Sequence, residues 1–167
     1  MSTERTANLL GAHALLVCER LRAAAGRELS SAAVLCALRT FAPGASIDEL
    51  RRVLRLSHSG GVRIVGRLER EGLVVRRVDQ TDRRALRIEL TAAGTGEADA
   101  ILAARRDALG SLLGALDPGE QETLAALLER GLGAATHGED DARHICRLCE
   151  PDVCGHPDRC PVTRALL

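Results

Sequence analysis

The spacing of apolar residues in the first part of the chain predicts a run of helices. Apolar side chains recur at helical intervals over residues 6–25, which predicts a long first helix. Ser30 or Ser31 is expected to cap a second helix, which ends before Pro43. The N-terminal region is therefore expected to be entirely helical.

Two shorter helices with clear N-terminal signals are expected next. Ser46 and Glu49 have the spacing of a capping box, in which each side chain accepts a hydrogen bond from a free backbone N–H. Ser57 can cap a fourth helix, and Gly72 is a natural left-handed stop for it. The inner face of this fourth helix is expected to carry Val62, Val65 and Leu68.

The apolar period then changes from helical to two, the period of a strand. Leu86, Ile88 and Leu90 alternate with charged residues, and residues 79–82 before them have the composition of a turn. The pattern predicts a β-hairpin directly after a helix. Its first strand is expected to face inward with Leu73, Val75 and Val78.

Two further helices are expected before a cysteine-rich tail. Thr91 can cap a long helix, and Asp117 with Glu120 has a second capping-box pattern before the last helix. This order is that of a winged helix-turn-helix domain in a mainly α-helical protein with one small β-hairpin. The expected regions are an N-terminal dimerisation helix at 1–28, a winged helix-turn-helix domain at 29–91, C-terminal dimerisation helices at 92–136 and the tail at 137–167.

Charge is balanced overall but unevenly distributed. The chain has 23 basic residues, all of them arginine, and 23 acidic residues. Residues 51–87 hold eleven arginines and four acidic residues, which leaves twelve and nineteen for the remainder. One basic segment in a neutral chain indicates contact with a polyanion there, although a solvated charged surface has the same pattern.

The dimensions of a helix make the fourth helix a candidate for DNA recognition. An α-helix is about 10–12 Å across and the major groove is about 12 Å wide, so its first residues can reach base edges. Arg63 can donate two hydrogen bonds to guanine, and two glycines would let the backbone approach the DNA closely. The expected contacts on this helix are Ser57, His58, Ser59, Gly60, Gly61, Arg63 and Arg67.

The hairpin supplies further basic groups beside this helix. Arg76 and Arg77 would meet phosphates, while Arg83 and Arg84 at the tip offer guanidinium groups to a minor groove. Helix and hairpin together favour double-stranded DNA as the partner.

The same segments resemble a known family. Residues 56–74 look like the recognition helix of the MarR family, and the run 79–84, followed by Leu86, Leu90, Thr91 and Gly94, is similar to its wing signature. The resemblance covers residues 6–135. It implies a homodimer joined through the first and the last two helices, with each subunit reading half of a palindromic site. It also implies that Arg84 enters the minor groove and that Asp82 orients it.

The tail contains four closely spaced cysteines, Cys146, Cys149, Cys154 and Cys160. In a cytoplasmic protein this spacing indicates a metal before a disulfide, and four thiolates suffice for tetrahedral zinc. An iron–sulfur cluster is the alternative, and a flexible or redox-active set of thiols is another. His144 and His156 are spare ligands. Cys18 and Cys36 lie among apolar residues and are expected to be buried.

Composition narrows the function further. Aromatic residues make up 1% of the chain, which argues against proteins that stack single-stranded bases on aromatic side chains. No apolar run reaches the roughly 18 residues of a membrane span, and the N-terminus lacks a signal-peptide pattern, so a cytoplasmic protein is expected. No phosphate loop or nucleophile–base signature indicates an enzyme.

These observations predict a DNA-binding transcription repressor that a small-molecule effector, metal or oxidant tunes. The alternative is a metal- or redox-responsive protein–protein adaptor whose hairpin binds a partner protein in place of DNA.

Overall fold

The computed structural model describes residues 2–79 and 85–167. Within these residues it confirms the mainly α-helical fold with one antiparallel hairpin. The main elements are α1 (Thr3–Ala25), α2 (Leu29–Thr40), α3 (Ile47–Leu54), α4 (His58–Arg70), β1 (Val74–Val78), β2 (Leu86–Leu90), α5 (Ala92–Leu113) and α6 (Pro118–Ala134). Three short helices complete the tail: α7 (Glu139–Ile145), α8 (Pro151–Cys154) and α9 (Pro161–Arg164).

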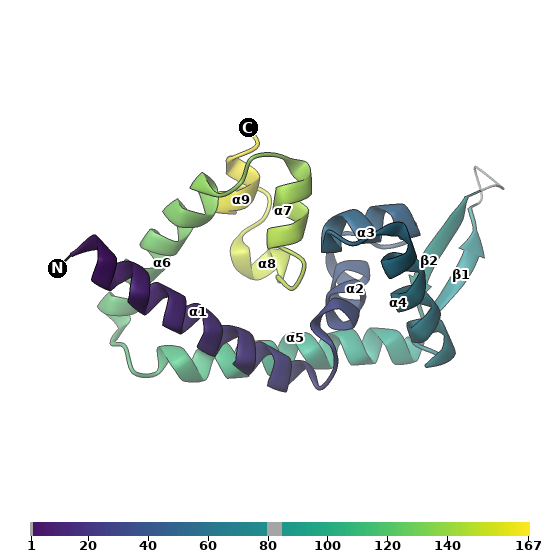
Figure 1. Cartoon of the computed structure of the whole chain (residues 1–167), viewed down its shortest axis with the longest axis horizontal. Coiled ribbons are helices and arrows are strands. Elements are labelled where there is room, and N and C mark those ends of the chain that lie inside the picture. Colours follow the sequence, from purple (N-terminus) through teal and green to yellow (C-terminus); the bar gives the residue numbers. More distant parts are fainter. Residues whose placement is uncertain (1, 80–84) are drawn as a thin grey trace.

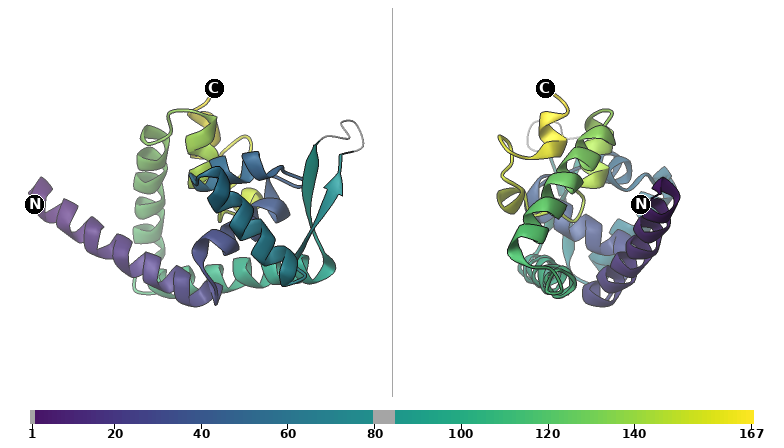
Figure 2. Two further views of the ribbon diagram at one scale, coloured as in Figure 1. Left: turned by 45° about the vertical axis from the view of Figure 1, so that its right-hand side comes forward. Right: turned by 90° about the vertical axis from the view of Figure 1, so that its left-hand side faces the viewer.

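The long helix α5 joins the two ends of the molecule (Figure 1). Helices α2, α3 and α4 and the hairpin lie at its N-terminal end, while α6 rises from its C-terminal end (Figures 1 and 2). Helix α1 runs along α5 in contact with it. The tail fills the space between these parts, because α9 contacts α6 and α7 contacts α3.

Side-chain caps explain where most of the helices begin. The hydroxyl of Ser57 accepts a hydrogen bond from the Gly60 N–H at 3.2 Å, and the predicted capping box of Ser46 and Glu49 is formed in full. The prediction for α2 is wrong. This helix begins at Leu29, and Ser31 lies inside it, 2% exposed.

A single core holds the winged domain together. Its largest fully buried side chains come from α2, α3, α4, β1 and β2, and they include Leu35, Leu50, Leu68 and Ile88. Ala98 of α5 packs into the same cluster, which fixes the domain on the long helix. Burial of this apolar surface stabilises the position of α4 relative to the hairpin.

Two predictions of inward-facing residues are wrong. Val62 on α4 is 38% exposed, and Val78 on β1 is 57% exposed. In β1 the buried residue is Val74, at 1% exposure, and not Val75. The physical reason is the left-handed turn at Gly72, with φ of 71°, after which Leu73 and Val74 both enter the core.

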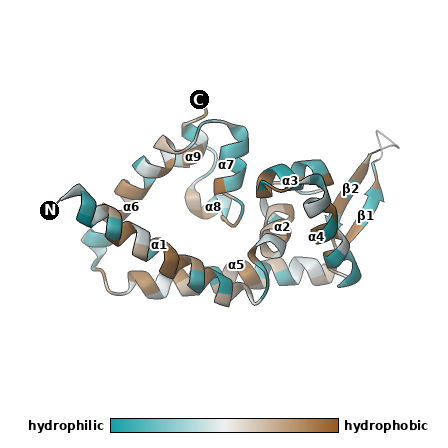
Figure 3. Ribbon diagram, in the orientation of Figure 1, coloured by the Kyte–Doolittle hydropathy of each residue, from teal (hydrophilic) through white to brown (hydrophobic). Residues whose placement is uncertain are grey.

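Apolar residues recur along α1 and α6 (Figure 3), and several of them are exposed in the single chain. Helix α6 has no buried residue at all in the single chain. The exposed residues on the two helices are Leu9, Leu10, Leu15, Leu16, Leu127, Leu128 and Leu132. Among the described residues, none of these or the other helices is long and apolar enough to cross a membrane.

Candidate nucleic-acid interface and cysteine cluster

The N-terminal turn of α4 presents polar side chains to solvent. Ser57, His58, Ser59 and Arg63 are all exposed. The two serine hydroxyls lie 3.1 Å apart, and His58 Nδ1 lies 3.4 Å from a carboxylate oxygen of Asp48 on α3. These contacts orient polar side chains at the end of the helix that carries free backbone N–H groups, where an anion is stabilised.

Gly60 and Gly61 are both buried in the first turns of α4. A Cβ atom on Gly61 would lie 3.2 Å from Arg51 Cβ and 3.3 Å from Ile47 Cγ2, so this glycine lets α3 and α4 pack closely. A Cβ atom on Gly60 would instead lie 3.3 Å from Ser57 Oγ and 3.4 Å from Leu56 Cβ, in the segment that leads into the helix.

Most of the basic side chains expected at the interface are paired with acids. Arg67 binds Glu28 at 2.8 Å, and Arg76 binds Glu69 at 3.2 Å. The guanidinium group of Arg77 lies 3.9 Å from Glu89. Among residues 2–79 and 85–167, Arg63 has no acidic partner.

An ion pair that the sequence did not indicate lies at the end of the hairpin strands nearest the connecting loop. Arg87 on β2 binds Asp79 at 2.5 Å and lies 3.6 Å from Glu49 on α3. The hydrogen bond that Arg87 donates to Asp79 raises the pKa of its guanidinium group. Arg87 thus ties Asp79, whose side chain is only 9% exposed, to Glu49 of α3. The predicted tip residues Asp82, Arg83 and Arg84 lie outside the described residues.

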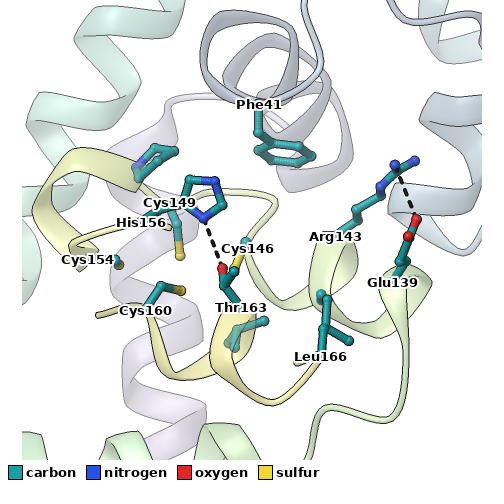
Figure 4. Close-up of a pocket in the computed structure, with 13 residues that line it drawn as sticks. Phe41, Glu139, Arg143, Cys146, Cys149, Cys154, His156, Cys160, Thr163 and Leu166 are labelled. Carbon is teal, nitrogen blue, oxygen red and sulfur yellow. Dashed lines mark hydrogen bonds and ion pairs between the residues drawn. The ribbon is translucent and has the colours of Figure 1, made fainter. Parts of the chain in front are cut away.

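The four tail cysteines come together around one cavity of about 330 Å³ (Figure 4). Cys146 follows α7, Cys149 lies in the next turn, Cys154 ends α8, and Cys160 precedes α9. Phe41, at the end of α2, lies across the cavity from them.

The thiols also contact one another. Side-chain hydrogen bonding with Cys149 raises the pKa of Cys146 and contributes to the raised pKa of Cys154. The bond with Cys146 lowers the pKa of Cys149, against the opposite effect of burial, and the charge of Arg105 lowers it further. All six cysteines of the chain are free thiols. No three His, Cys, Asp or Glu side chains of the described residues converge as closely as the ligands of a bound metal ion.

The Nδ1 atoms of the two histidines near the cysteines form hydrogen bonds with residues other than the cysteines. His144 donates a hydrogen bond to the carbonyl oxygen of Val53 in α3 at 2.8 Å, and its burial lowers its pKa. His156 Nδ1 lies 2.9 Å from the Thr163 hydroxyl. The bond of His144 anchors the tail to the helix that precedes α4.

Ion pairs and apolar contact complete this anchorage. Asp141 of α7 binds Arg55 at the end of α3, and Glu150 binds Arg106 of α5. Leu148 packs against the core of the winged domain. The tail is thus attached to both α3 and α5.

The remaining two cysteines differ from each other. Cys36 is fully buried in α2, and desolvation raises its pKa to about 12, as expected for a structural thiol. Cys18 is exposed on α1, so its predicted burial is wrong for the single chain.

The arrangement of α3, α4 and the hairpin on α5 defines the class: a winged helix-turn-helix protein. Residues 25–85 match the sequence model of the MarR family, and the chain carries a MarR-family domain. None of the curated proteins matches the chain in sequence.

Solved structures of MarR-family regulators share the fold. YusO of Bacillus subtilis has a TM-score of 0.66 at 21% identity, and the match covers 81% of this chain and 100% of YusO. MarR of E. coli, in its apo form, has a TM-score of 0.63 at 22% identity, covering 79% and 97% of the two chains. CouR of Rhodococcus jostii, solved with p-coumaroyl-CoA, has a TM-score of 0.57 at 26% identity, covering 72% and 87%. The chain therefore shares its fold with these proteins over most of its length.

Proposed function

We propose that this protein is a homodimeric transcription repressor that binds palindromic double-stranded DNA. Helix α4 enters the major groove, and the tip of the hairpin reaches the adjacent minor groove. The observation that carries the proposal is the exposed first turn of α4, beside the hairpin, in a MarR-family domain.

Arg63 is the strongest candidate for direct base recognition. It is exposed on α4, and no acid among the described residues neutralises it. A guanidinium group can donate two parallel hydrogen bonds to guanine, and such a pair discriminates by about 1–3 kcal/mol. Arg67, Arg76 and Arg77 would first have to give up Glu28, Glu69 and Glu89 to bind phosphates.

The exposed leucines support a homodimer built on α1 and α6. Exposed leucines concentrated on two helices indicate a protein interface, because leaving them in water is unfavourable. A second copy of the chain supplies a matching surface, since the two helices recur in it. Two α4 helices related by a two-fold axis can then read two half-sites about 34–36 Å apart.

Ligand response is the remaining part of the proposal. CouR was solved with p-coumaroyl-CoA bound. We infer that an effector also tunes DNA binding here, and its chemistry is left open.

The test is retrieval of genomic DNA fragments by the purified protein, followed by sequencing. A repressor enriches a short palindromic sequence, and its affinity for that sequence falls steeply with salt because each bound phosphate releases counterions. Arg84→Ala should then weaken binding by about 1–3 kcal/mol without loss of folding. A protein that enriches no sequence, and whose weak DNA binding ignores Arg63 and Arg84, contradicts the proposal and favours a protein–protein adaptor.

A further inference from the structure

We propose that Cys146, Cys149, Cys154 and Cys160 bind one zinc ion per chain, which holds the C-terminal tail in place between α6 and α3. The proposal does not depend on DNA binding. It rests on the position of the four thiols, the small core of the tail and the charges around the cluster.

The first argument is geometric. Four thiols that are up to fourteen positions apart in sequence line the same cavity, and each lies at the end of a short helix or in a turn (Figure 4). The Cys149 N–H donates a 2.8 Å hydrogen bond to the Cys146 carbonyl, so these two thiols leave one tight turn. After Cys154 the chain reverses at Gly155, with φ of 70°, and Cys160 returns to the cluster, 4% exposed.

The tail also lacks the apolar core that would fold it without help. In residues 139–167 the only buried apolar side chains are Cys160 and Val162. Helices α8 and α9 have four residues each, which is too short for independent stability. Small modules of this kind are stabilised by metal binding, because its free energy becomes folding free energy. The short helices therefore need a link such as the one that four thiolates and a metal ion provide.

Nearby charges suit a zinc tetrathiolate. Four thiolates and one zinc ion carry a net charge of −2. Two guanidinium groups, those of Arg105 on α5 and Arg147 in the tail, lie close enough to Cys149 to act on it electrostatically. The two positive charges offset the charge of the loaded site, which reduces the cost of burying it. All four ligands would be protein thiolates, so the role is structural and not catalytic.

The experiment uses the full-length, untagged protein, purified in air without added metal. We expect about one zinc per chain by elemental analysis, a colourless solution, and release of the zinc when a mercurial reagent titrates the thiols. Replacement of zinc by Co²⁺ should give the intense visible absorption of a tetrahedral cobalt–thiolate site. A brown protein that contains iron and sulfide overturns the proposal, and so does a metal-free protein in which the four tail thiols react freely.

Variants identify the ligands. Cys149→Ser and Cys160→Ser should each reduce the bound zinc at least about tenfold after dialysis against a weak chelator, since a three-thiolate site binds less tightly. Cys18→Ser removes an exposed thiol on α1 and should keep one zinc per chain. Circular dichroism checks that the helices of the variants remain folded. Zinc retained in full by both tail variants contradicts this ligand set, whatever the DNA-binding result.

Discussion

Gly94, in the first turn of α5, is the position where one methyl group should disturb the winged domain most. A Cβ atom there would lie 1.9 Å from the backbone carbonyl oxygen of Leu73 and 2.8 Å from its carbon. Real contacts of this kind are not shorter than 3.0 Å, so the start of the hairpin must move away from α5 by about 1 Å. The same oxygen accepts hydrogen bonds from the Thr91 N–H at 3.0 Å and, more weakly, from its hydroxyl at 3.3 Å.

The magnitude follows from three effects. Overpacking costs about 1–3 kcal/mol, and weakening the bonds to the Leu73 carbonyl costs about 1 kcal/mol more. Alanine regains about 1 kcal/mol of helix propensity over glycine. We therefore expect Gly94→Ala to lower the free energy of unfolding by about 1–3 kcal/mol and the melting temperature by about 2–12 °C.

Gly96 is a matched control in the same turn of the same helix. It is exposed, and a Cβ atom added there meets nothing within 4 Å. Gly96→Ala should therefore raise stability by about 0.5–1 kcal/mol. The assay is thermal and urea unfolding followed by circular dichroism at one protein concentration, because dimer stability depends on concentration. A Gly94→Ala protein as stable as the wild type would refute the close approach of α5 to the Leu73 carbonyl.

Three further predictions concern the interface, the dimer and a helix cap. Arg63→Ala should weaken binding to the enriched DNA about 5- to 150-fold, measured by anisotropy, while Arg70→Ala at the other end of α4 changes it less; equal effects contradict direct readout. Leu127→Glu should shift sedimentation from dimer towards monomer at micromolar concentration, and an unchanged dimer excludes α6 from the interface. Glu49→Ala should cost about 0.5–1 kcal/mol at neutral pH by loss of the α3 capping box. Hydrogen bonding to Ser46 lowers the pKa of Glu49 in the folded protein. The stability that the carboxylate adds is therefore fully present above the pKa of Glu49 in the unfolded chain, and it is lost as pH falls through the lower pKa of the folded state. The difference in the free energy of unfolding between Glu49→Ala and the wild type, measured with urea, should therefore shrink in acid. A difference that stays constant with pH contradicts this.

Local signals in the sequence were sufficient to place most helix ends. Ser46, Ser57, Thr91 and Asp117 each accept a hydrogen bond from a backbone N–H two or three residues into the helix, as their residue types predict. Such bonds join neighbours in sequence, so they can be predicted without knowledge of the fold. The cap of α2 was predicted wrongly because tertiary packing buries Ser31 inside the helix.

Contacts between distant segments could not be predicted in this way. Gly61 suits either a close approach to DNA or close helix packing, and only the position of α3 shows that it packs against Arg51 and Ile47. In the same way, the four cysteines indicate a metal by their spacing alone, but their position across from Phe41 requires the path of the whole tail. The anchor from His144 to Val53 joins residues 91 positions apart.

The distribution of charge along the sequence does not give the net charge of the folded surface, again because residues distant in sequence come into contact. Residues 51–87 carry eleven arginines against four acids, yet Arg67 and Arg55 are neutralised by Glu28 and Asp141, which lie outside this segment. An arginine that keeps its acid in the complex contributes little to counterion release, because its charge is already balanced. The salt dependence of DNA binding should therefore reflect the arginines without an acidic partner, such as Arg63, more than the total for the segment.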